Sequence, residues 1–141
     1  MDLRLSERER LDADPNAYFK IRALAQYGSS GVLMHEGMIL AVFGYVELWP
    51  GAYEVWAFPS VHVETYPMIY LRTMKRYIRM LEKSHKPHRL QTSSMKDELH
   101  DRWMRFLGFE CETPDGMKNY SVLKQTFNLW AKTYEEADHG V

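Results

Sequence analysis

Six histidines are the side chains of this sequence that could most directly bind a metal ion or transfer a proton. They are scattered along the chain, as His35, His62, His85, His88, His100 and His139. No two have the i, i+4 spacing that places two ligands on one helix face, and Pro87 interrupts the pair nearest in sequence. A single cysteine, Cys111, excludes an internal disulfide and a multi-cysteine zinc site. The sequence therefore predicts structural histidines and no metal site.

A group of basic side chains could bind a phosphate or an acidic partner. After Pro67, apolar residues recur every three or four positions, which predicts an amphipathic helix that ends near Pro87. Between the apolar positions stand Arg72, Lys75, Arg76 and Arg79. Such a face could contact a phosphate, a nucleic-acid backbone or an acidic protein surface. The same composition is also typical of an ordinary solvated helix face.

Aromatic residues gather around one predicted turn and strand. Trp49, Tyr53 and Trp56 flank the Pro50-Gly51 turn, with Tyr45 and Phe58 nearby. Because side chains alternate along a strand, some of these aromatics must point to each face of the sheet. Those that point inward belong to the core. Any that stay exposed would form an interaction surface for another protein, since Trp and Tyr often anchor interfaces.

The elements that would hold these side chains alternate between helix and strand. A helix is expected from Pro15 to Gly28, and two apolar runs around Glu36-Gly37 predict a hairpin. A third strand is expected from Tyr53 to Phe58, after the Pro50-Gly51 turn. The basic helix described above follows this strand.

The second half of the chain predicts a strand, a short helix and two more strands. The strand covers about His88 to Ser93, and the short helix has Asp97 as a possible N-cap and Gly108 as its stop. Its apolar face would consist of Leu99, Trp103, Phe106 and Leu107. The last two strands should flank a turn at Pro114-Asp115-Gly116, and a tail follows them.

Composition limits the class of protein. The chain has 141 residues, of which 45% are hydrophobic and 26% charged, as in a single globular domain. The net charge of -1 gives no global indication of a nucleic-acid partner. No apolar stretch is long enough for a membrane span, and the charged start is unlike a signal peptide. We therefore expect a protein of the cytoplasm.

The order of elements is typical of an α/β or α+β protein with helices packed on a sheet. From Ala17 to Gln125 it resembles the GNAT acetyltransferase superfamily. The matching segments are GYVELWPGAYEVWAF, HRLQTSSM and FLGFECETPDGMKNYSVL, and the most specific signature is Leu107-Gly108-Phe109. The resemblance implies a single GNAT-like domain with a mixed, mostly antiparallel twisted sheet flanked by helices.

The resemblance also implies where acetyl-CoA would bind. In that superfamily the pyrophosphate lies on bare backbone N–H groups of a glycine-bearing loop at a helix N-terminus. The matching stretch here, PSVHVETYPM, has no glycine, and Pro67 has no N–H. If acetyl-CoA binds, the residues implied to contact it are Val61, His62, Val63 and Tyr66.

For catalysis, the resemblance implies an Asn that opens the short helix and a Tyr that protonates the departing thiolate. In this chain Asp97 stands at the first of these positions and Met104 at the second, and a thioether cannot donate a proton. Glu54 is the carboxylate placed where a general base could act on an amine, with Glu47 as a second candidate. Both are also compatible with a solvent-facing position on a strand.

A narrower resemblance concerns the short helix and the segment after it. HDRWMRFLGF and GMKNYSVLK are similar to the internal virion protein A family of T-odd-type podophages, whose members are similar to GNAT domains but lack the cofactor loop. The basic run RTMKRYIRMLEK is also similar. The residues that carry the similarity are His100, Arg102, Trp103, Met104, Gly108 and Asp115-Gly116. This resemblance implies virion or assembly proteins as partners.

Two functions from different classes are compatible with these observations. The first is a catalytically degenerate GNAT-like phage protein without a cofactor, which has a structural, virion-assembly or genome-delivery role in the host cytoplasm or the virion. The alternative is a divergent N-acetyltransferase that transfers an acetyl group from acetyl-CoA to an amine. For the domain organisation we expect an N-terminal arm at residues 1–14, a GNAT-like domain at 15–126 and a C-terminal tail at 127–141.

Overall fold

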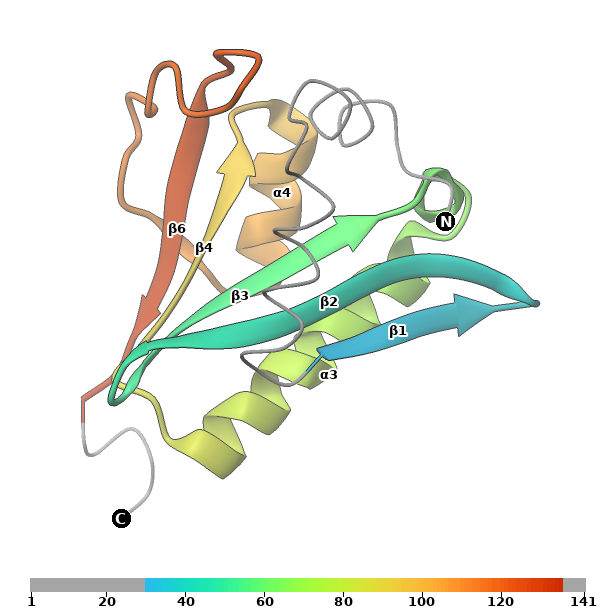
Figure 1. Cartoon of the computed structure of the whole chain (residues 1–141), viewed down its shortest axis with the longest axis horizontal. Coiled ribbons are helices and arrows are strands. Elements are labelled where there is room, and N and C mark those ends of the chain that lie inside the picture. The colour runs from blue at the N-terminus through green and yellow to red at the C-terminus, as the bar shows by residue number, and fades with distance from the viewer. Residues whose placement is uncertain (1–29, 136–141) are drawn as a thin grey trace.

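A computed structural model gives the structure of the chain and describes residues 30–135 (Figure 1). The predicted N-terminal arm and the helix expected from Pro15 to Gly28 lie outside the described residues.

Six strands form one sheet in the order β1-β2-β3-β4-β6-β5. Neighbouring strands run antiparallel except β3 and β4, which run parallel. The predicted mixed, mostly antiparallel sheet is therefore confirmed. The strands are β1 Ser30–His35, β2 Met38–Trp49, β3 Ala52–Pro59, β4 Arg89–Met95, β5 Glu110–Cys111 and β6 Phe127–Thr133.

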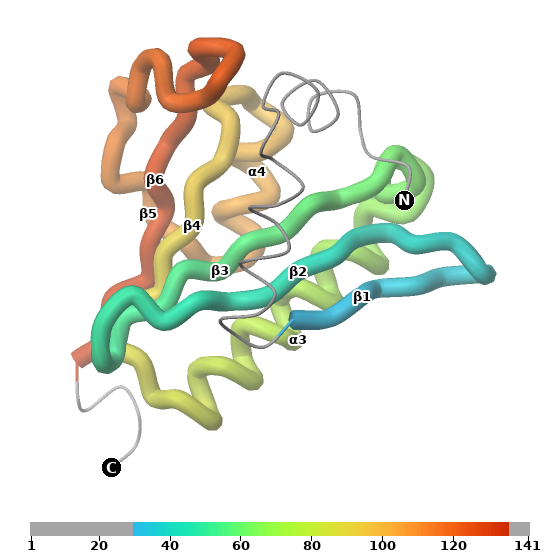
Figure 2. The backbone as a smooth tube through the Cα atoms, in the orientation of Figure 1, coloured from blue at the N-terminus to red at the C-terminus, as the bar shows by residue number. Residues whose placement is uncertain are grey.

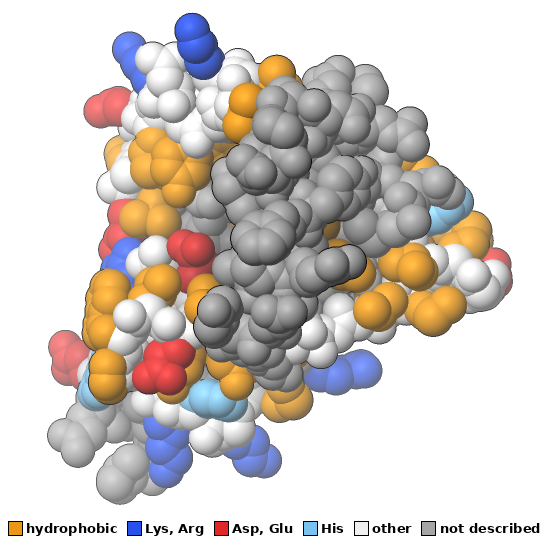
Figure 3. Space-filling model, viewed as in Figure 1, with side chains coloured by type: hydrophobic (Ala, Val, Ile, Leu, Met, Phe, Trp, Pro, Cys, Tyr) orange, Lys and Arg blue, Asp and Glu red, His pale blue; other side chains and the backbone are white. Residues whose placement is uncertain are grey.

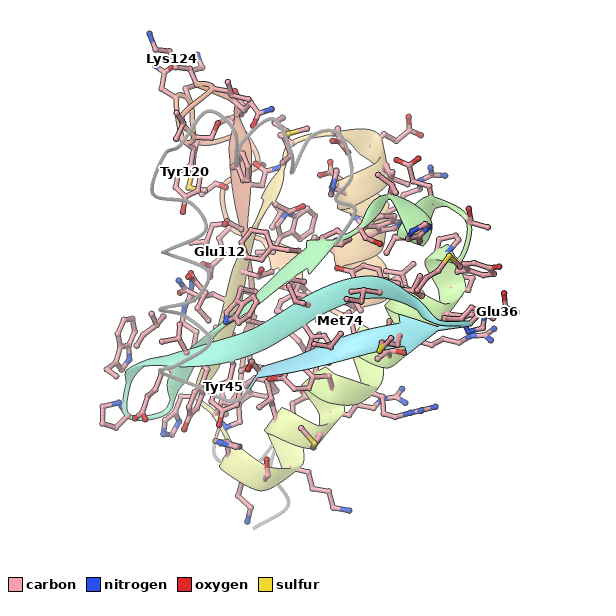
Figure 4. All side chains as sticks on the ribbon, turned by 45° about the vertical axis from the view of Figure 1, so that its right-hand side comes forward. Glu36, Tyr45, Met74, Glu112, Tyr120 and Lys124 are labelled. Carbon is pink, nitrogen blue, oxygen red and sulfur yellow. The ribbon has the colours of Figure 1, made fainter. Side chains whose placement is uncertain are left out.

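Two turns fix the first half of the sheet. Glu36 and Gly37 have φ values of 51° and 78°, and two positive φ values in a two-residue loop are typical of the hairpin turn that suits the twist of the strands. Glu36 lies at the tip of this hairpin (Figure 4). At the next turn, the carbonyl of Gly51 accepts hydrogen bonds from the N–H groups of His88 and Arg89. The β2–β3 turn thus holds the start of β4.

Two helices cover one face of the sheet. The helix α3, Pro67–His85, follows a short 3-10 helix η1, Val61–Glu64, and α4 is Glu98–Phe106. His85 of α3 contacts Tyr53, and Arg105 of α4 lies over the ring of Trp130. The register of the sheet places Tyr53 and Trp130 on the same face, so both helices pack there, and α3 passes behind β1 and β2 in Figure 1.

The predicted ends of the short helix are confirmed, but its predicted apolar face is only half right. The side chain of Asp97 accepts a hydrogen bond from the His100 N–H at 2.8 Å, and Gly108 has a φ of 92°. Trp103 and Leu107 are buried. Leu99 and Phe106 remain 37% and 36% exposed, because they lie on the side of α4 that faces α3 across a groove rather than the sheet.

The C-terminal part corrects the sequence prediction. The expected return strand directly after Pro114-Asp115-Gly116 is absent from the described residues, where a loop over 112–126 follows β5 instead. Figure 4 shows Tyr120 and Lys124 on this loop, where the ring of Tyr120 packs against that of Phe127 at the start of β6. The prediction of a C-terminal tail at residues 127–141 is wrong for its first seven residues, because Phe127–Thr133 form β6 between β4 and β5. Trp130 there is only 1% exposed, so the segment belongs to the core.

The core lies between the helices and the sheet. From α3, buried side chains recur every three or four residues, as the amphipathic pattern predicts. They meet buried residues from four strands and from α4. The main members are Leu40, Val55, Leu71, Met74, Ile78, Leu81, Leu90, Trp103, Leu107, Phe109 and Trp130.

Candidate functional site

Strands β3 and β4 diverge within the sheet. Their parallel pairing covers only Ala52 with Arg89, Tyr53 with Leu90, and Glu54 with Gln91. Beyond Glu54, β3 continues to Pro59 and β4 to Met95 without further pairing between them. The two strands open like a V (Figures 1 and 2). A parallel pair that splits in its middle leaves polar backbone groups and a space between the strands.

A cavity of about 160 Å³ occupies this split. Side chains from both faces of β3 and β4 line it, together with residues of α3 and α4. The lining consists of Glu54, Val55, Trp56, Ala57, Phe58, Pro59, Tyr70, Thr92, Ser93, Ser94, Met95, His100, Trp103, Met104 and Phe127. It combines an apolar majority with a few polar groups, which is typical of a small-ligand site.

Glu54, the predicted catalytic residue, lies where the strands begin to part. Its Oε1 accepts a hydrogen bond from Nε2 of Gln91 at 3.1 Å, and its side chain lines the cavity. Glu47, the second candidate, is exposed near the far end of β2 and is not part of the lining. The structure therefore brings only the first carboxylate to the cavity.

A hydrogen-bonded Asp97–His100 pair also reaches the cavity, and it was not predicted from the sequence. Nδ1 of His100 lies 2.8 and 2.7 Å from the two carboxylate oxygens of Asp97, and His100 lines the cavity beside Met104. A carboxylate that accepts from Nδ1 leaves Nε2 as the proton acceptor of a neutral imidazole. The i, i+3 spacing of Asp97 and His100 on a predicted helix was the signal available in the sequence.

The connection between β3 and α3 uses its backbone N–H groups internally. The N–H of His62 donates to Oγ of Ser60 at 3.2 Å, and that of Val63 donates to the Ser60 carbonyl at 3.2 Å. The N–H groups of Thr65 and Tyr66 both donate to the carbonyl of His62. Ser60 is fully buried, and its hydroxyl donates to the Ile39 carbonyl at 2.6 Å. A tight, anchored turn therefore replaces an open loop.

Two side chains of this connection, those of Val63 and Tyr66, lie in different places. Val63 is fully buried in the core. Tyr66 reaches the β1–β2 turn, where its hydroxyl donates to Glu36 Oε2 at 3.1 Å and its ring stacks edge-on against His35. The hydrogen bond to the carboxylate raises the pKa of Tyr66. Of the predicted cofactor residues Val61, His62, Val63 and Tyr66, the third is thus buried and the fourth is engaged at the β1–β2 turn, and contact of this segment with acetyl-CoA stays a prediction.

The three aromatic residues predicted as an interaction surface lie in different places. Trp49 is 57% exposed at the end of β2. Tyr53 packs on the helix side against Tyr45 and His85, and burial raises its pKa, with a smaller contribution from the charge of Glu47. Trp56 lies on the opposite face of β3, beside Phe58 and along the cavity.

The basic residues of α3 divide into two groups. Arg72, Arg76 and Arg79 are exposed. Lys75 is half-buried and places its Nζ 4.6 Å from the centre of the Phe106 ring, so it faces α4. On the sheet face seen in Figure 3, Lys and Arg side chains lie toward the edges of the view. The predicted basic face is therefore a feature of the helix side.

Neither a metal cluster nor a membrane-spanning helix occurs in the described part of the chain. Between residues 30 and 135, no group of three or more His, Cys, Asp or Glu side chains could hold a metal ion. Among the helices described, none is long and apolar enough to cross a bilayer.

Comparison with solved structures gives the fold a name. An IAA acetyltransferase from Bacillus cereus matches with a TM-score of 0.69 at 15% identity, covering 89% of each chain. A GNAT family acetyltransferase from Elizabethkingia anophelis with acetyl-CoA bound matches with a TM-score of 0.66 at 14% identity, covering 89% of this chain and 88% of that one. The ribosomal-protein-S5-alanine acetyltransferase of Vibrio fischeri gives 0.64 at 17% identity, over 86% and 73% of the two chains. The chain has the GNAT acetyltransferase fold.

Sequence comparison adds nothing to this result, since no family model and no curated protein matches the chain. The structural likeness supports the predicted GNAT superfamily at the level of the fold, and the similarity to phage internal virion proteins stays a prediction.

The connection that would carry acetyl-CoA in a GNAT fold does not fit a pyrophosphate. Four N–H groups of the connection are consumed inside the turn, those of His62, Val63, Thr65 and Tyr66. Pro67 at the helix start has no N–H, and no glycine lies between Gly51 and Gly108. In the first turn of α3, the N–H groups of Met68 and Ile69 have no acceptor within the helix.

Proposed function

We propose that this chain is a GNAT-fold protein that does not use acetyl-CoA and acts as a structural or assembly component of a phage particle. The role would be in virion assembly or genome delivery, with other virion or assembly proteins as partners. The protein would act in the host cytoplasm and enter the particle from there.

One observation carries the first half of this proposal, the closed β3–α3 connection. An anion at a helix N-terminus is held by backbone N–H groups that point at it, and a donor already bonded within the turn is lost to the ligand. The buried Ser60 fastens the turn to the carbonyl of Ile39, so opening it would leave buried polar groups unpaired. Met104 in place of a proton-donating Tyr agrees with the loss of acyl transfer.

The phage role is supported by the residues around α4 that resemble internal virion proteins. Of these, Trp103 is buried in the core and Gly108 ends the helix with a positive φ. Arg102 is exposed on the same helix and is available for contacts with another protein. A fold that keeps its core and changes its site is expected when a scaffold takes on a new role.

Acetyl-CoA titration tests the loss of the cofactor. A ligand that binds only the folded state stabilises it by about 2.7 kcal/mol at a hundredfold excess over Kd, which is a readily measured shift in Tm. We expect no shift with acetyl-CoA or CoA at millimolar concentration, while an active GNAT acetyltransferase measured alongside shifts. A saturable shift with a micromolar Kd would contradict the proposal.

Particle composition tests the assembly role. We expect the chain to co-purify with complete particles of the phage that encodes it, at a constant copy number per particle through density-gradient centrifugation. Quantitative mass spectrometry of the purified particles measures this ratio. A chain that stays in the soluble fraction of the lysate at every stage of infection would count against the assembly role.

The cavity in the strand split favours a second function, divergent N-acetyl transfer to an amine. Glu54 lines the cavity and is the carboxylate that would accept the proton of an amine there, held in place by Gln91. Acetylation of a panel of amines, followed by mass spectrometry, tests it. If this function holds, Glu54→Gln should lower the rate by about 10²-fold or more while the fold is kept.

A further inference from the structure

An open groove runs between the first half of α3 and α4. It has a volume of about 520 Å³ and is separate from the cavity in the strand split, with which it shares only Trp103. Its lining is mostly apolar. The residues are Glu64, Pro67, Met68, Leu71, Leu99, Arg102, Trp103 and Phe106.

The walls of this groove expose large apolar side chains. Leu71 and Trp103 are buried, at 5% and 8% exposure, and form its floor. Met68 on one wall is 42% exposed, and Leu99 and Phe106 on the other are 37% and 36% exposed. Leu99, Trp103 and Phe106 follow the i, i+4, i+7 spacing of one helix face. Contiguous exposed apolar surface of this kind is typical of a docking site.

Positive charge surrounds the same groove. Lys75 lies over the ring of Phe106, and Arg72 and Arg79 flank it one turn away on either side along α3. Arg102 is part of the lining on α4. Within residues 30–135, no carboxylate forms an ion pair with Arg72, Arg79 or Arg102, and Glu64 is the one acidic side chain in the lining. The chain as a whole carries a net charge of -1, so these cations are locally concentrated.

We propose that this groove binds an acidic amphipathic helix of a partner protein. Leucine-like side chains at i, i+3 or i+4, and i+7 of that helix would enter the groove, as in other helix-in-groove complexes. Its flanking carboxylates would pair with Arg72, Arg79 and Arg102, which sets its orientation and speeds association. The inference rests on the proposed function, for which it supplies the docking surface.

The occupant follows from the combination of apolar walls and cations that surround them. The phosphates of a nucleic-acid strand could pair with the cations. Its bases, however, would find only one ring to stack on among the wall residues Met68, Leu99 and Phe106, and no hydrogen-bonding side chain among these three. A small neutral ligand could contact the apolar walls of the groove but would form no ion pair with the arginines. An acidic amphipathic helix satisfies both features.

Three synthetic peptides test the proposal by fluorescence anisotropy against the full chain. The first is a helix-forming peptide with leucines at i, i+4 and i+7 and glutamates on both flanks. The second has the same composition in scrambled order, and the third carries lysine in place of glutamate. We expect the first peptide to bind at least tenfold more tightly than either of the others.

Matched variants locate the binding. Phe106→Ser and Arg102→Glu should each weaken binding of the first peptide at least tenfold. Because Phe106 is only 36% exposed, its truncation also lowers the Tm, and binding is compared at a temperature at which circular dichroism shows both variants to be folded. The controls Val122→Ser and Lys118→Glu make equivalent changes on the exposed 112–126 loop, and they should leave binding unchanged. Equal binding of the three peptides, no binding, or equal effects of the groove and loop variants would overturn the inference.

Two further titrations separate this inference from the proposed function. A single-stranded oligonucleotide and an anionic lipid vesicle should bind more weakly than the first peptide, and tighter binding of either would overturn the helix as occupant.

Acetyl-CoA is then titrated into the complex of the chain with the first peptide. If acetyl-CoA binds and displaces the peptide, the proposed function is contradicted, whereas the inference that the groove binds an acidic helix is kept. If neither acetyl-CoA nor the peptide binds, the groove inference fails and the proposed function stands.

Discussion

Asp97 holds the start of α4 with a single carboxylate. It accepts hydrogen bonds from the backbone N–H of His100 and from the ring of the same residue. We expect Asp97→Ala to lower the free energy of unfolding by about 1–2 kcal/mol, because the helix loses its N-cap. Asp97→Asn can still accept from the backbone N–H and should cost less. Urea unfolding at neutral pH measures both variants, and equal losses would show that the cap contributes little.

Glu112 forms a two-pronged ion pair with Arg89, with oxygen–nitrogen distances of 3.1 and 2.5 Å. The hydrogen bonds from Arg89 hold the pKa of Glu112 below its ordinary value, and the charge of Arg89 acts in the same direction. A lowered carboxyl pKa contributes stability above the ordinary pKa, and this contribution is lost as the pH falls through the lowered one.

We therefore expect Glu112→Gln to cost less than about 1 kcal/mol at neutral pH, since both side chains are partly exposed. The difference from the parent chain should shrink as the solution is acidified below the ordinary carboxyl pKa of about 4. Chemical unfolding at a series of pH values measures it. A difference that stays constant down to about pH 2 would rule out the linkage.

Among the elements, α4 depends on the conformation of Gly108 at its end. With a φ of 92°, this position is strained for any residue with a Cβ. A Cβ would also lie 3.2 Å from Nζ of Lys132, but that group is the end of a flexible side chain and can move. We expect Gly108→Ala to cost at least about 1 kcal/mol, with Gly108→Asn intermediate because Asn tolerates positive φ better. Thermal unfolding of the three proteins should give that order, and an unchanged Tm for Gly108→Ala would contradict it.

The turn between β3 and α3 depends on Ser60. Its hydroxyl accepts from the His62 N–H and donates to the Ile39 carbonyl, and the residue is fully buried. Ser60→Ala should cost about 1–3 kcal/mol, because the Ile39 carbonyl and the His62 N–H, both in half-buried residues, lose their partner. Ser84→Ala is the control, since Ser84 is exposed and bonds only within its own neighbourhood of α3. Comparable small losses in urea unfolding for both variants would contradict this view of the turn.

The six-stranded sheet as a unit requires β6. This strand pairs with β4 along its full length and with β5, and it places Trp130 in the core. A chain that ends at residue 126 should therefore fail to fold, whereas one that ends at Glu135 should fold like the full chain. Circular dichroism and the dispersion of amide NMR signals distinguish the two. A folded, cooperative 1–126 fragment would restore the domain boundary that the sequence predicts.

Local signals were sufficient for most elements. Glu36-Gly37, Asp97 and Gly108 were predicted correctly because turn and cap chemistry depends on neighbouring residues. The position of β6 was not, because pairing across the 112–126 loop depends on where Phe127 and Trp130 can be buried rather than on the nearby Pro114-Asp115-Gly116 turn. The exposure of Leu99 and Phe106 could not be predicted either, since a helical pattern does not show which element lies opposite it.

For the molecule as a whole, the amino-acid pattern was enough to predict the order and type of most elements and the mixed sheet. It also showed that the segment at which a GNAT domain would bind a pyrophosphate contains no glycine. These features follow from periodicity, turn residues and backbone chemistry, which act over a few positions. Three features emerge only when the chain is folded. Four N–H groups of the β3–α3 connection donate within the turn, β3 and β4 part beyond Glu54, and α3 and α4 leave an apolar groove with basic residues beside it. Each of these depends on which distant segments meet, and in a compact fold that is fixed by burial of the core as a whole.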